Sequence, residues 1–321
     1  PDPYAGWVIS VIFKILFRRK KYDFIISTAP PWSSHLAAIF IGRLLHIPVI
    51  LDDRDPWADS MGRMAIITHP SMRRIDKFIA EYCYSKAAGI VSVTRAACDL
   101  HKEKSGDNSM PIEYIPSGYD PILDKHYHSW IRRKEITIIH VGSTYHGRSP
   151  LIILEAAKEL NKAMAEDFNF RFIGRISQAE INAINSMDKR FRVTIDGFKD
   201  HEYCIKAIIE SDICLLMAIG QPLQIPCKLY EYIGLGRPVL AVSGKNDSTM
   251  RMLENKGWAW TAANDDKIGL IKTLENIHQR WKNDSLPYSE MEKERKDFSF
   301  NTVADKYIMV VREIVDREKA K

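Results

Sequence analysis

The stretch Ile225-Pro-Cys-Lys-Leu-Tyr-Glu-Tyr-Ile-Gly-Leu-Gly-Arg-Pro-Val239 predicts a loop, a short helix and the start of a strand. Proline suits the first turn of a helix at Pro226, and glycine suits its end at Gly236. Free backbone amides at the start of such a helix attract anions, and Lys228 adds a positive charge there. Glu231 follows on the same face of the helix. The stretch therefore predicts a phosphate site beside an acidic group that is suited to binding ribose hydroxyls.

Apolar runs rich in β-branched residues recur along the chain, with helix-like segments such as 151–163 and 202–210 between them. Runs of this kind are typical of strands that are buried on both faces. Their alternation with helices predicts parallel sheets of the doubly wound type, which bind ligands beyond the carboxyl ends of the strands. The runs are 23–27, 48–52, 89–93, 112–115, 136–141, 168–173, 191–195, 213–217 and 238–242.

A stretch without hydrophobic periodicity, residues 118–134, separates two groups of these runs. At roughly 150 residues per domain, a chain of 321 residues is expected to form two domains. We expect residues 1–125 to form one Rossmann-like domain and residues 126–297 to form a second. The first group contains only four runs, which are few for such a domain. We therefore expect the first domain to be incomplete and the chain to be truncated at its N-terminus.

The composition is that of a globular protein, with 45% hydrophobic and 27% charged residues. The net charge is only +5, and there is no arginine-rich tract with interleaved aromatic residues, so nucleic acid is not an expected partner. The five cysteines are odd in number and form no Cys-x-x-Cys pair, which favours a reducing cytoplasm over a disulfide framework. Several aspartates lie close together at 52–55, but Arg54 in their midst argues against a metal site.

A second candidate site is the loop His140-Val-Gly-Ser-Thr-Tyr-His-Gly-Arg148, which follows a predicted strand. Gly142 and Gly147 permit close backbone approach to a diphosphate. Arg148 can neutralise the diphosphate, by a bidentate contact where the geometry allows. A glycine loop is a weak motif by itself, and both histidines of the loop can equally be packed or capping residues.

The third candidate site consists of two loops in the first domain, Ser27-Thr-Ala-Pro-Pro-Trp-Ser-Ser-His35 and Leu51-Asp-Asp-Arg-Asp-Pro-Trp57. Each loop lies at the carboxyl end of a predicted strand. Asp53, Arg54 and Asp55 place opposite charges on one short loop, where a leaving phosphate or an acceptor hydroxyl can be handled. The alternative is an Arg–Asp pair that only fixes the conformation of this loop.

The pattern Pro226-x-Lys-Leu-Tyr-Glu-Tyr-x-x-x-Gly-Arg-Pro-Val239 resembles the donor-binding signature of the family 4 glycosyltransferases, which have the GT-B fold. The loops 27–35 and 51–57 are similar to segments of a bacterial branch of this family that makes surface polysaccharides. Residues 296–301 and the helix after them resemble the family's closing segment, so residues 298–321 are expected to return to the first domain. The resemblance implies two Rossmann-like domains with a nucleotide-sugar donor between them.

The resemblance also implies the reaction, which is sugar transfer from a nucleoside-diphosphate sugar to a hydroxyl acceptor. It implies retention of anomeric configuration, with no metal ion and no cofactor. Lys228 and Arg148 would hold the diphosphate, Glu231 would bind the ribose, and the charges of the loop 51–57 would act at the reaction centre. The donor-binding residues so implied are Gly142, Ser143, Arg148, Arg175, Phe198, Pro226, Lys228, Leu229 and Glu231.

One position departs from the family's pattern. The family often has a glutamate eight positions before the one that matches Glu231, and Leu223 stands there. In relatives this first glutamate contacts the donor sugar, so the sequence does not indicate which sugar is used. Two other classes stay open, namely a non-catalytic subunit that binds a nucleotide sugar and a GT-B sugar epimerase.

The N-terminal stretch Trp7-Val-Ile-Ser-Val-Ile-Phe-Lys-Ile-Leu-Phe17 is apolar and is followed by Arg18-Arg-Lys-Lys21. It is shorter than the ~20 apolar residues that cross a bilayer. We expect this stretch either to lie on an anionic membrane surface or to cover the first sheet. The protein is thus expected in the cytoplasm, peripheral to the membrane in the first case, with a saccharide or a lipid-linked saccharide as its acceptor.

Overall fold

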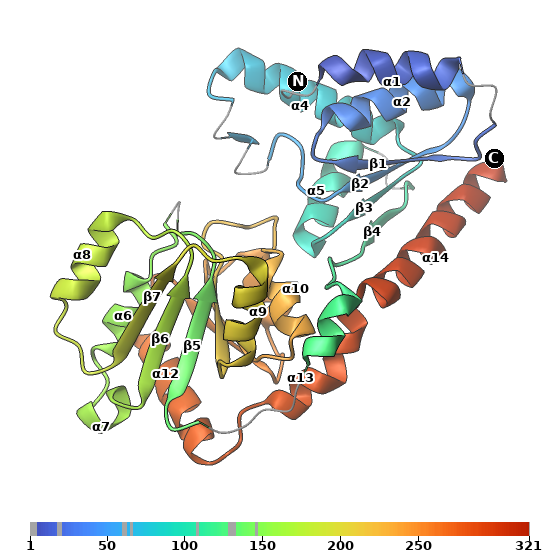
Figure 1. The fold of residues 1–321 in the computed structure, drawn as a ribbon. Coiled ribbons are helices and arrows are strands. Elements are labelled where there is room, and N and C mark those ends of the chain that lie inside the picture. Colours follow the sequence, from blue (N-terminus) through green and yellow to red (C-terminus); the bar gives the residue numbers. More distant parts are fainter. Residues whose placement is uncertain are drawn as a thin grey trace. The chain divides into compact units, whose positions relative to one another are not determined.

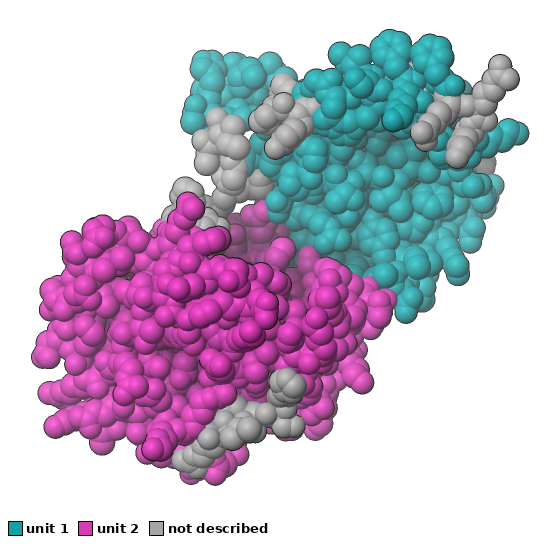
Figure 2. Space-filling view, viewed as in Figure 1, with its two compact units in different colours: residues 1–116, 303–321 teal, residues 117–302 magenta. Residues whose placement is uncertain are grey.

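The computed structural model describes residues 5–17, 21–59, 63–64, 67–106, 109–127, 133–144 and 147–320. The chain forms two compact units (Figure 2), of which unit 1 contains residues 1–116 and 303–321 and unit 2 contains residues 117–302. These divisions fall at 116/117 and 302/303, whereas we expected 125/126 and 297/298. The shift at the first division has a packing cause, because Tyr119 and Leu123 belong to a core of unit 2, the latter in the 3-10 helix η1 (Pro121–His126).

Unit 1 is built on a four-stranded parallel sheet with the order β1-β2-β3-β4. Its strands are β1 (Ile25–Ala29), β2 (Val49–Asp53), β3 (Gly89–Ser92) and β4 (Ile112–Tyr114), each of which overlaps a predicted run. Its helices are α1 (Gly6–Leu16), α2 (Ser33–Leu45), α4 (Pro70–Lys86), α5 (Arg95–Ser105) and most of α14 (Phe300–Lys319) (Figure 1).

The sheet of unit 1 is covered on both faces, because successive residues of a strand point to opposite sides. Val49 and Leu51 of β2 pack with buried residues of α2, α4 and α5. Ile50, which lies between them, packs with Val91 of β3 and with Ile314 of α14. The last helix therefore returns to cover one face of this sheet, and α2, α4 and α5 cover the opposite face. Helix α1 packs against α2, and among the described residues none of the helices combines the length and the hydropathy that a bilayer-crossing segment needs.

Unit 2 is built on a six-stranded parallel sheet with the order β10-β9-β8-β5-β6-β7. The strands are β5 (Ile136–Val141), β6 (Phe168–Ile173), β7 (Arg192–Gly197), β8 (Ile213–Met217), β9 (Val239–Ser243) and β10 (Ala259–Ala263). The first five overlap predicted runs, and the two sheets with their alternating helices confirm the predicted fold class. Strand β10 was missed because Ala-Trp-Thr-Ala-Ala contains no run of β-branched apolar residues.

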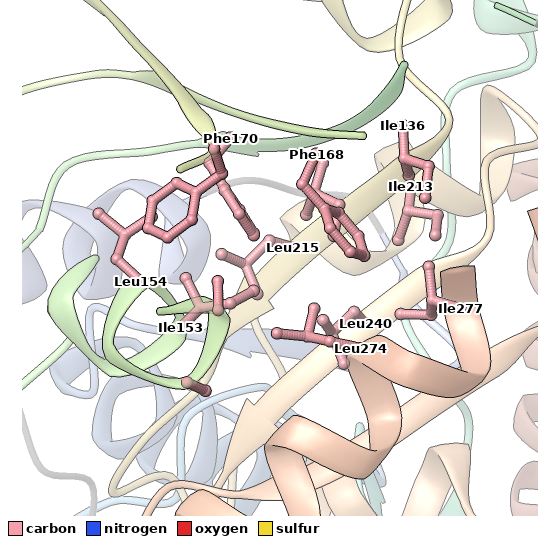
Figure 3. Packing of buried hydrophobic residues seen from close by; sticks show 14 of the residues in the cluster. Ile136, Ile153, Leu154, Phe168, Phe170, Ile213, Leu215, Leu240, Leu274 and Ile277 are labelled. Atoms are coloured by element: carbon pink, nitrogen blue, oxygen red, sulfur yellow. The ribbon is translucent and has the colours of Figure 1, made fainter. Parts of the chain in front are cut away.

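Helices cover both faces of the second sheet as well. One face packs against α6 (Leu151–Ala157), α8 (Gln178–Ser186) and α12 (Lys267–Lys282), and Figure 3 shows Phe168, Phe170 and Leu215 beside Leu154 and Leu274. The opposite core includes residues of α9 (His201–Ile209), α10 (Lys228–Gly234), α11 (Ser248–Leu253), α13 (Tyr288–Arg295) and η2 (Lys296–Phe298).

The predicted helix 151–163 is interrupted in the structure. It ends with α6, and a separate short helix α7 (Lys162–Ala165) follows. Asn161 starts α7, because its side chain accepts a hydrogen bond from the amide of Met164 at 3.0 Å. A side-chain cap of this kind competes with continuation of the preceding helix.

The chain changes direction across the second sheet beside β5. It passes from β5 to β6 and β7 on one side and then returns to β8 on the other side of β5. Open α/β sheets bind ligands beyond the carboxyl ends of their strands at such a reversal. The loops after β5 and β8 therefore mark the candidate site of unit 2, and they carry the two motifs 140–148 and 225–239.

Candidate functional site

The loop after β5 is held against the loop after β6 by its backbone. The amide of Gly142 donates to the carbonyl of Ile173 at 2.8 Å, and the amide of Thr144 donates to the carbonyl of Arg175 at 2.9 Å. A Cβ atom on Gly174 would lie 2.2 Å from the carbonyl oxygen of Gly142, and Gly174 has a φ of +138°. Only glycine allows this approach, so the two loops form one fixed surface.

Side chains complete the attachment of this loop. The hydroxyl of Ser143 accepts a hydrogen bond from the amide of Arg175 at 3.3 Å. The hydroxyl of Thr144 donates to the carboxylate of Glu180 at 3.1 Å, and Glu180 also closes the capping box at the start of α8. Gly147 has a φ of +82°, and the two residues before it lie outside the described part of the chain. The predicted glycine loop thus has a fixed first half, and Arg148 follows it.

His140 lies at the end of β5 and is buried. Its Nδ1 donates to the carbonyl of Leu215 on β8 at 3.0 Å, which fixes the tautomer. Its Nε2 faces the glycine loop, since a Cβ atom on Gly142 would lie 3.2 Å from it. Burial lowers the pKa of His140 to about 4. The positive charges of Arg148 and Lys228 also lower this pKa, against the effect of hydrogen bonds with the backbone of Leu215 and Gly142. The imidazole is therefore neutral at physiological pH, and both predicted phosphate-binding cations lie near it.

Helix α10 separates its side chains into a buried and an accessible set. Leu229, Tyr230 and Tyr232 are buried, and the hydroxyl of Tyr232 accepts a hydrogen bond from the amide of Val141 at 3.1 Å. That bond attaches α10 to the end of β5, next to the glycine loop. The apolar residues of the motif therefore build the fold, while its charged residues stay partly in solvent.

Lys228 and Glu231 form the accessible set. Their side chains are 35% and 30% exposed, and Lys228 Nζ lies 2.7 Å from Glu231 Oε2. His201, the first residue of α9, places Nε2 at 3.9 Å from the same carboxylate oxygen. The two charged residues predicted from the spacing of the motif are thus brought together beside the end of β8.

The start of α10 differs from the expectation of free amides. The amides of Leu229 and Tyr230 donate to the carbonyls of Pro226 and Cys227 at 3.0 and 3.1 Å. These two amides are therefore used within the first turn, and the side chain of Leu229 points into the core. The positive charge at this end comes from the side chain of Lys228.

The second half of the motif 225–239 stabilises the fold of unit 2. Gly236 ends the helix at a φ of +67°, and a Cβ atom there would meet the ring of Tyr127 at 2.3 Å. Arg237 is buried, donates to the carbonyl of Ile209 at 2.9 Å and lies over the ring of Tyr288. Burial lowers the pKa of Arg237 below its ordinary value. This arginine therefore serves packing within unit 2.

Arg175 and Phe198 lie at the ends of the adjacent strands β6 and β7. The guanidinium of Arg175 lies 5.8 Å from the centre of the Phe198 ring, and most of that ring is exposed. An accessible aromatic ring beside a glycine loop can stack on a nucleobase. These two predicted residues thus contact each other on the β6–β7 side of the glycine loop.

The loop after β8 is anchored by residues that the sequence analysis did not single out. Asp247 accepts hydrogen bonds from the amides of Gly220 and Gly244 at 3.1 and 2.8 Å. The hydroxyl of Ser248 donates to the carbonyl of Pro222 at 2.5 Å. Both anchors precede or begin α11, and Asp-Ser at the start of a helix was the signal that could have indicated them. They fix the backbone on the N-terminal side of Leu223.

In unit 1, Asp53 at the end of β2 is completely buried. Its carboxylate accepts a hydrogen bond from Tyr84 at 2.7 Å and lies 3.3 Å from Nε2 of His101 and 3.9 Å from Nε2 of His35. Burial, assisted by the charge of Asp53, raises the pKa of Tyr84, and burial lowers the pKa of His101. The Asp53 carboxylate thus belongs to a buried polar network and is not exposed to solvent in this structure.

The rest of this loop is more accessible. Arg54 Nε donates to Asp52 Oδ2 at 3.2 Å, and the Arg54 side chain is substantially exposed. Thr28 also donates to that oxygen, at 3.1 Å. The carbonyl of Asp55 accepts a hydrogen bond from Trp32 at 2.8 Å. The pairing partner of Arg54 is therefore Asp52, and the loops after β1 and β2 are tied together.

This arrangement predicts a structural effect for Asp53. Replacing it by alanine should lower the free energy of unfolding by about 2–4 kcal/mol, because Tyr84 loses its acceptor inside the core. Arg54→Ala should lower the free energy of unfolding by a smaller amount, about 1 kcal/mol, because the buried Asp52 loses one donor but keeps the hydrogen bond from Thr28. Urea unfolding followed by circular dichroism measures both. Unchanged stability of Asp53→Ala would contradict the structural role.

A cavity of about 680 Å³ lies at the opposite end of the first sheet. Its lining includes Pro48 before β2, Ala88 before β3, Pro111 before β4 and Lys319 at the end of α14. These positions precede the strands, whereas parallel sheets bind ligands after them. The cavity is therefore separate from the candidate site.

Solved structures of glycosyltransferases resemble this chain in fold. HepE from Anabaena, crystallised in complex with UDP, matches with a TM-score of 0.72 and 12% sequence identity over 96% of this chain and 82% of HepE. The sucrose-phosphate synthase of Thermosynechococcus elongatus matches with a TM-score of 0.67 and 14% identity over 98% and 80% of the two chains. A glycosyltransferase from Rickettsia africae ESF-5 gives 0.66 and 15% over 98% and 82%.

The chain has the GT-B fold. At these identities the likeness concerns the fold, and no family model and no curated protein matches the sequence. Within the GT-B fold, unit 2 supplies the sheet whose strand order reverses at β5 and β8, where Lys228, Glu231 and the glycine loop lie. Among the described residues, no three His, Cys, Asp or Glu side chains are grouped as metal ligands.

Proposed function

We propose that this protein is a glycosyltransferase that uses a nucleoside-diphosphate sugar as its donor. The observation that carries the proposal is the Lys228–Glu231 pair, which lies beside the glycine loop of β5 where the strand order of unit 2 reverses. A cation suits a diphosphate, and an adjacent carboxylate suits ribose hydroxyls. The fold supports it too, since HepE has been crystallised in complex with UDP-glucose.

The donor would be held by groups of unit 2. Lys228 and Arg148 carry the positive charge for the diphosphate, and their charges already act on the same buried His140. Glu231 binds the ribose, and the backbone of Gly142 and Ser143 lies beside the phosphates. Phe198 stacks on the base with Arg175 behind its ring. Pro226 and Leu229 fix the position of Lys228 through the first turn of α10.

The chemical step would be transfer with retention of configuration, without a metal ion or cofactor, as the resemblance to family 4 suggests. Lys228 and Arg148 neutralise charge that develops on the leaving diphosphate. Arg54 and Asp55, which are partly exposed charges of the unit 1 loop, would act on the acceptor hydroxyl, and Asp53 would position that loop through Tyr84. A growing polysaccharide or a lipid-linked saccharide is the acceptor class.

A donor panel tests the proposal. The purified chain is titrated by calorimetry with UDP, GDP and ADP, and release of the diphosphate from the corresponding glucose and galactose donors is then measured with saccharide acceptors. We expect saturable binding of one diphosphate and turnover of its sugar. Binding without turnover would identify a non-catalytic subunit, the class that Leu223 favours, and interconversion of the donor sugar would identify an epimerase. No binding would contradict the proposal.

A further inference from the structure

His140 is a buried titratable residue at the edge of the donor site, and the proposed sugar transfer does not use it. Its side chain lies in the interior of unit 2, where only 6% of the residue is exposed. The ring contacts two elements at once, because Nδ1 lies 3.0 Å from the carbonyl oxygen of Leu215 on β8 and Nε2 faces Gly142 in the glycine loop. The imidazole thus lies between β8 and the glycine loop, where the strand order of the sheet reverses.

The backbone around the ring suits a doubly protonated imidazole. Hydrogen bonds with the backbone of Leu215 and of Gly142 both favour the charged form of His140. The amide of Gly142 already donates to the carbonyl of Ile173 at 2.8 Å, so the group of Gly142 that can accept from Nε2 is its carbonyl. A neutral imidazole donates from one nitrogen only, whereas the imidazolium donates from both. Protonation would therefore let the ring bind β8 and the glycine loop together.

Two cations of the donor site oppose this protonation. Burial is the main cause that lowers the pKa of His140 to about 4, and the charges of Arg148 and Lys228 lower it as well. These are the two side chains that would hold the diphosphate. A bound diphosphate would neutralise both charges and place its own negative charge beside the glycine loop. A nearby anion favours the charged form of a histidine, so the pKa of His140 should be higher in the donor complex than in the free protein.

The neighbouring tyrosine and thiol cannot supply the same response. The hydroxyl of Tyr232 on α10 accepts a hydrogen bond from the amide of Val141, and Cys214 on β8 is completely buried. Burial raises the pKa of both groups well above their ordinary values. Both therefore stay protonated at neutral and weakly acidic pH, whether or not a donor is bound.

We infer that His140 is a positioning residue of the donor site, which takes up a proton when the diphosphate binds and then holds the glycine loop to β8. The inference rests on the proposed function, and it adds a coupling between donor binding and pH. The direction follows from the higher pKa in the complex. Donor affinity should rise as the pH falls through the pKa of the complex, and it should level off near pH 4, where the free protein is protonated too.

Calorimetry of the purified chain tests the coupling. UDP-glucose, GDP-glucose and ADP-glucose are the probes, because a diphosphate esterified at both ends does not itself titrate in this range. Each titration is run in two buffers of different ionisation enthalpy, since the difference between the observed enthalpies gives the protons taken up. We expect about half a proton or more per bound donor at pH 5.5 and almost none at pH 8. The affinity should be about tenfold higher at pH 5 than at pH 7.5.

Two other histidines require a control. Nε2 of His201 lies 3.9 Å from the carboxylate of Glu231, and His146 belongs to the glycine loop but lies outside the described residues. The double variant His146→Gln, His201→Gln should still take up the proton. His140→Asn is the opposite variant, because an amide nitrogen can replace Nδ1 as the donor to Leu215 but cannot gain a proton. It should bind the donor at pH 8 and lose both the proton uptake and the gain in affinity at pH 5.

The outcomes separate this inference from the proposed function. Donor binding with equal enthalpies in the two buffers at pH 5.5 would overturn the inference and leave the proposed function intact. Loss of the proton uptake in His146→Gln, His201→Gln would also overturn it, because the proton would then belong to one of those residues. Absence of binding with all three donors would contradict the proposed function and this inference together. Thermal unfolding curves verify that His140→Asn is folded, and the parent protein and the double variant decide the question without it.

Discussion

Replacement of Glu231 by alanine should weaken binding of a nucleoside diphosphate at least about 100-fold and leave the protein folded. A carboxylate that bridges two ribose hydroxyls accepts two charge-assisted hydrogen bonds, each worth about 1.5–3 kcal/mol. Loss of both corresponds to two or more orders of magnitude in Kd, because ~1.4 kcal/mol is tenfold. The Glu231 side chain is 30% exposed and contacts Lys228 and His201, so its removal does not open the core.

The measurement is calorimetric titration with UDP, combined with a thermal unfolding curve for each protein. Glu202→Ala is the matched control, because Glu202 is an exposed helical glutamate that pairs with Lys206 at 2.9 Å. The control should bind UDP like the parent protein. If Glu231 served only as the partner of Lys228, the variant would lose thermal stability and keep its affinity for UDP, and the assignment of the ribose site would be wrong.

Periodicity and composition predicted most of the fold because parallel strands buried on both faces have distinctive sequences. The run 136–141 coincides with β5, which is buried throughout, and 168–173 coincides with β6, in which the buried Phe168, Phe170 and Phe172 alternate with half-buried polar residues. Strand β10 was missed because its sequence Ala-Trp-Thr-Ala-Ala contains no run of β-branched apolar residues. The break between α6 and α7 was missed because it depends on the local cap at Asn161.

In the candidate site, sequence reasoning worked where spacing alone fixes geometry. The interval between Lys228 and Glu231 puts both on one side of a single helical turn, and the structure brings them within 2.7 Å. The same reasoning could not place Asp53, because its burial is decided by Tyr84 and His101 from α4 and α5, which are distant in sequence. Local sequence shows which charges are present, and tertiary packing decides which of them can reach a substrate.

His140 is a second residue whose surroundings the sequence could not predict. A histidine in an apolar strand is ordinarily a packed residue, and the bond from Nδ1 to Leu215 agrees with that interpretation. Its Nε2, however, faces the glycine loop, because a Cβ atom on Gly142 would lie 3.2 Å from it. The sequence could not reveal this, because the position of the ring depends on the pairing of β5 with β8.

Arg148→Ala should lower kcat by about 100- to 1,000-fold while changing the affinity for UDP much less. The prediction follows from the difference in charge between the bound donor and the transition state. Charge grows on the diphosphate as the sugar leaves, so a cation aimed at it stabilises the transition state more than the bound donor. Arg148 follows Gly147 in the loop after β5, and its charge reaches the buried His140, which lies beside Gly142.

Steady-state kinetics with the preferred donor measure kcat and KM separately, and calorimetry gives the Kd of UDP. Arg148→Lys is the matched variant, because lysine keeps the charge but lacks the planar fork that contacts two oxygens at once. We expect it to recover part of kcat. A rise in KM with unchanged kcat for Arg148→Ala would assign this residue to ground-state binding instead. An equal loss of kcat in Arg148→Lys and Arg148→Ala would mean that the bidentate geometry, rather than the charge, carries the effect.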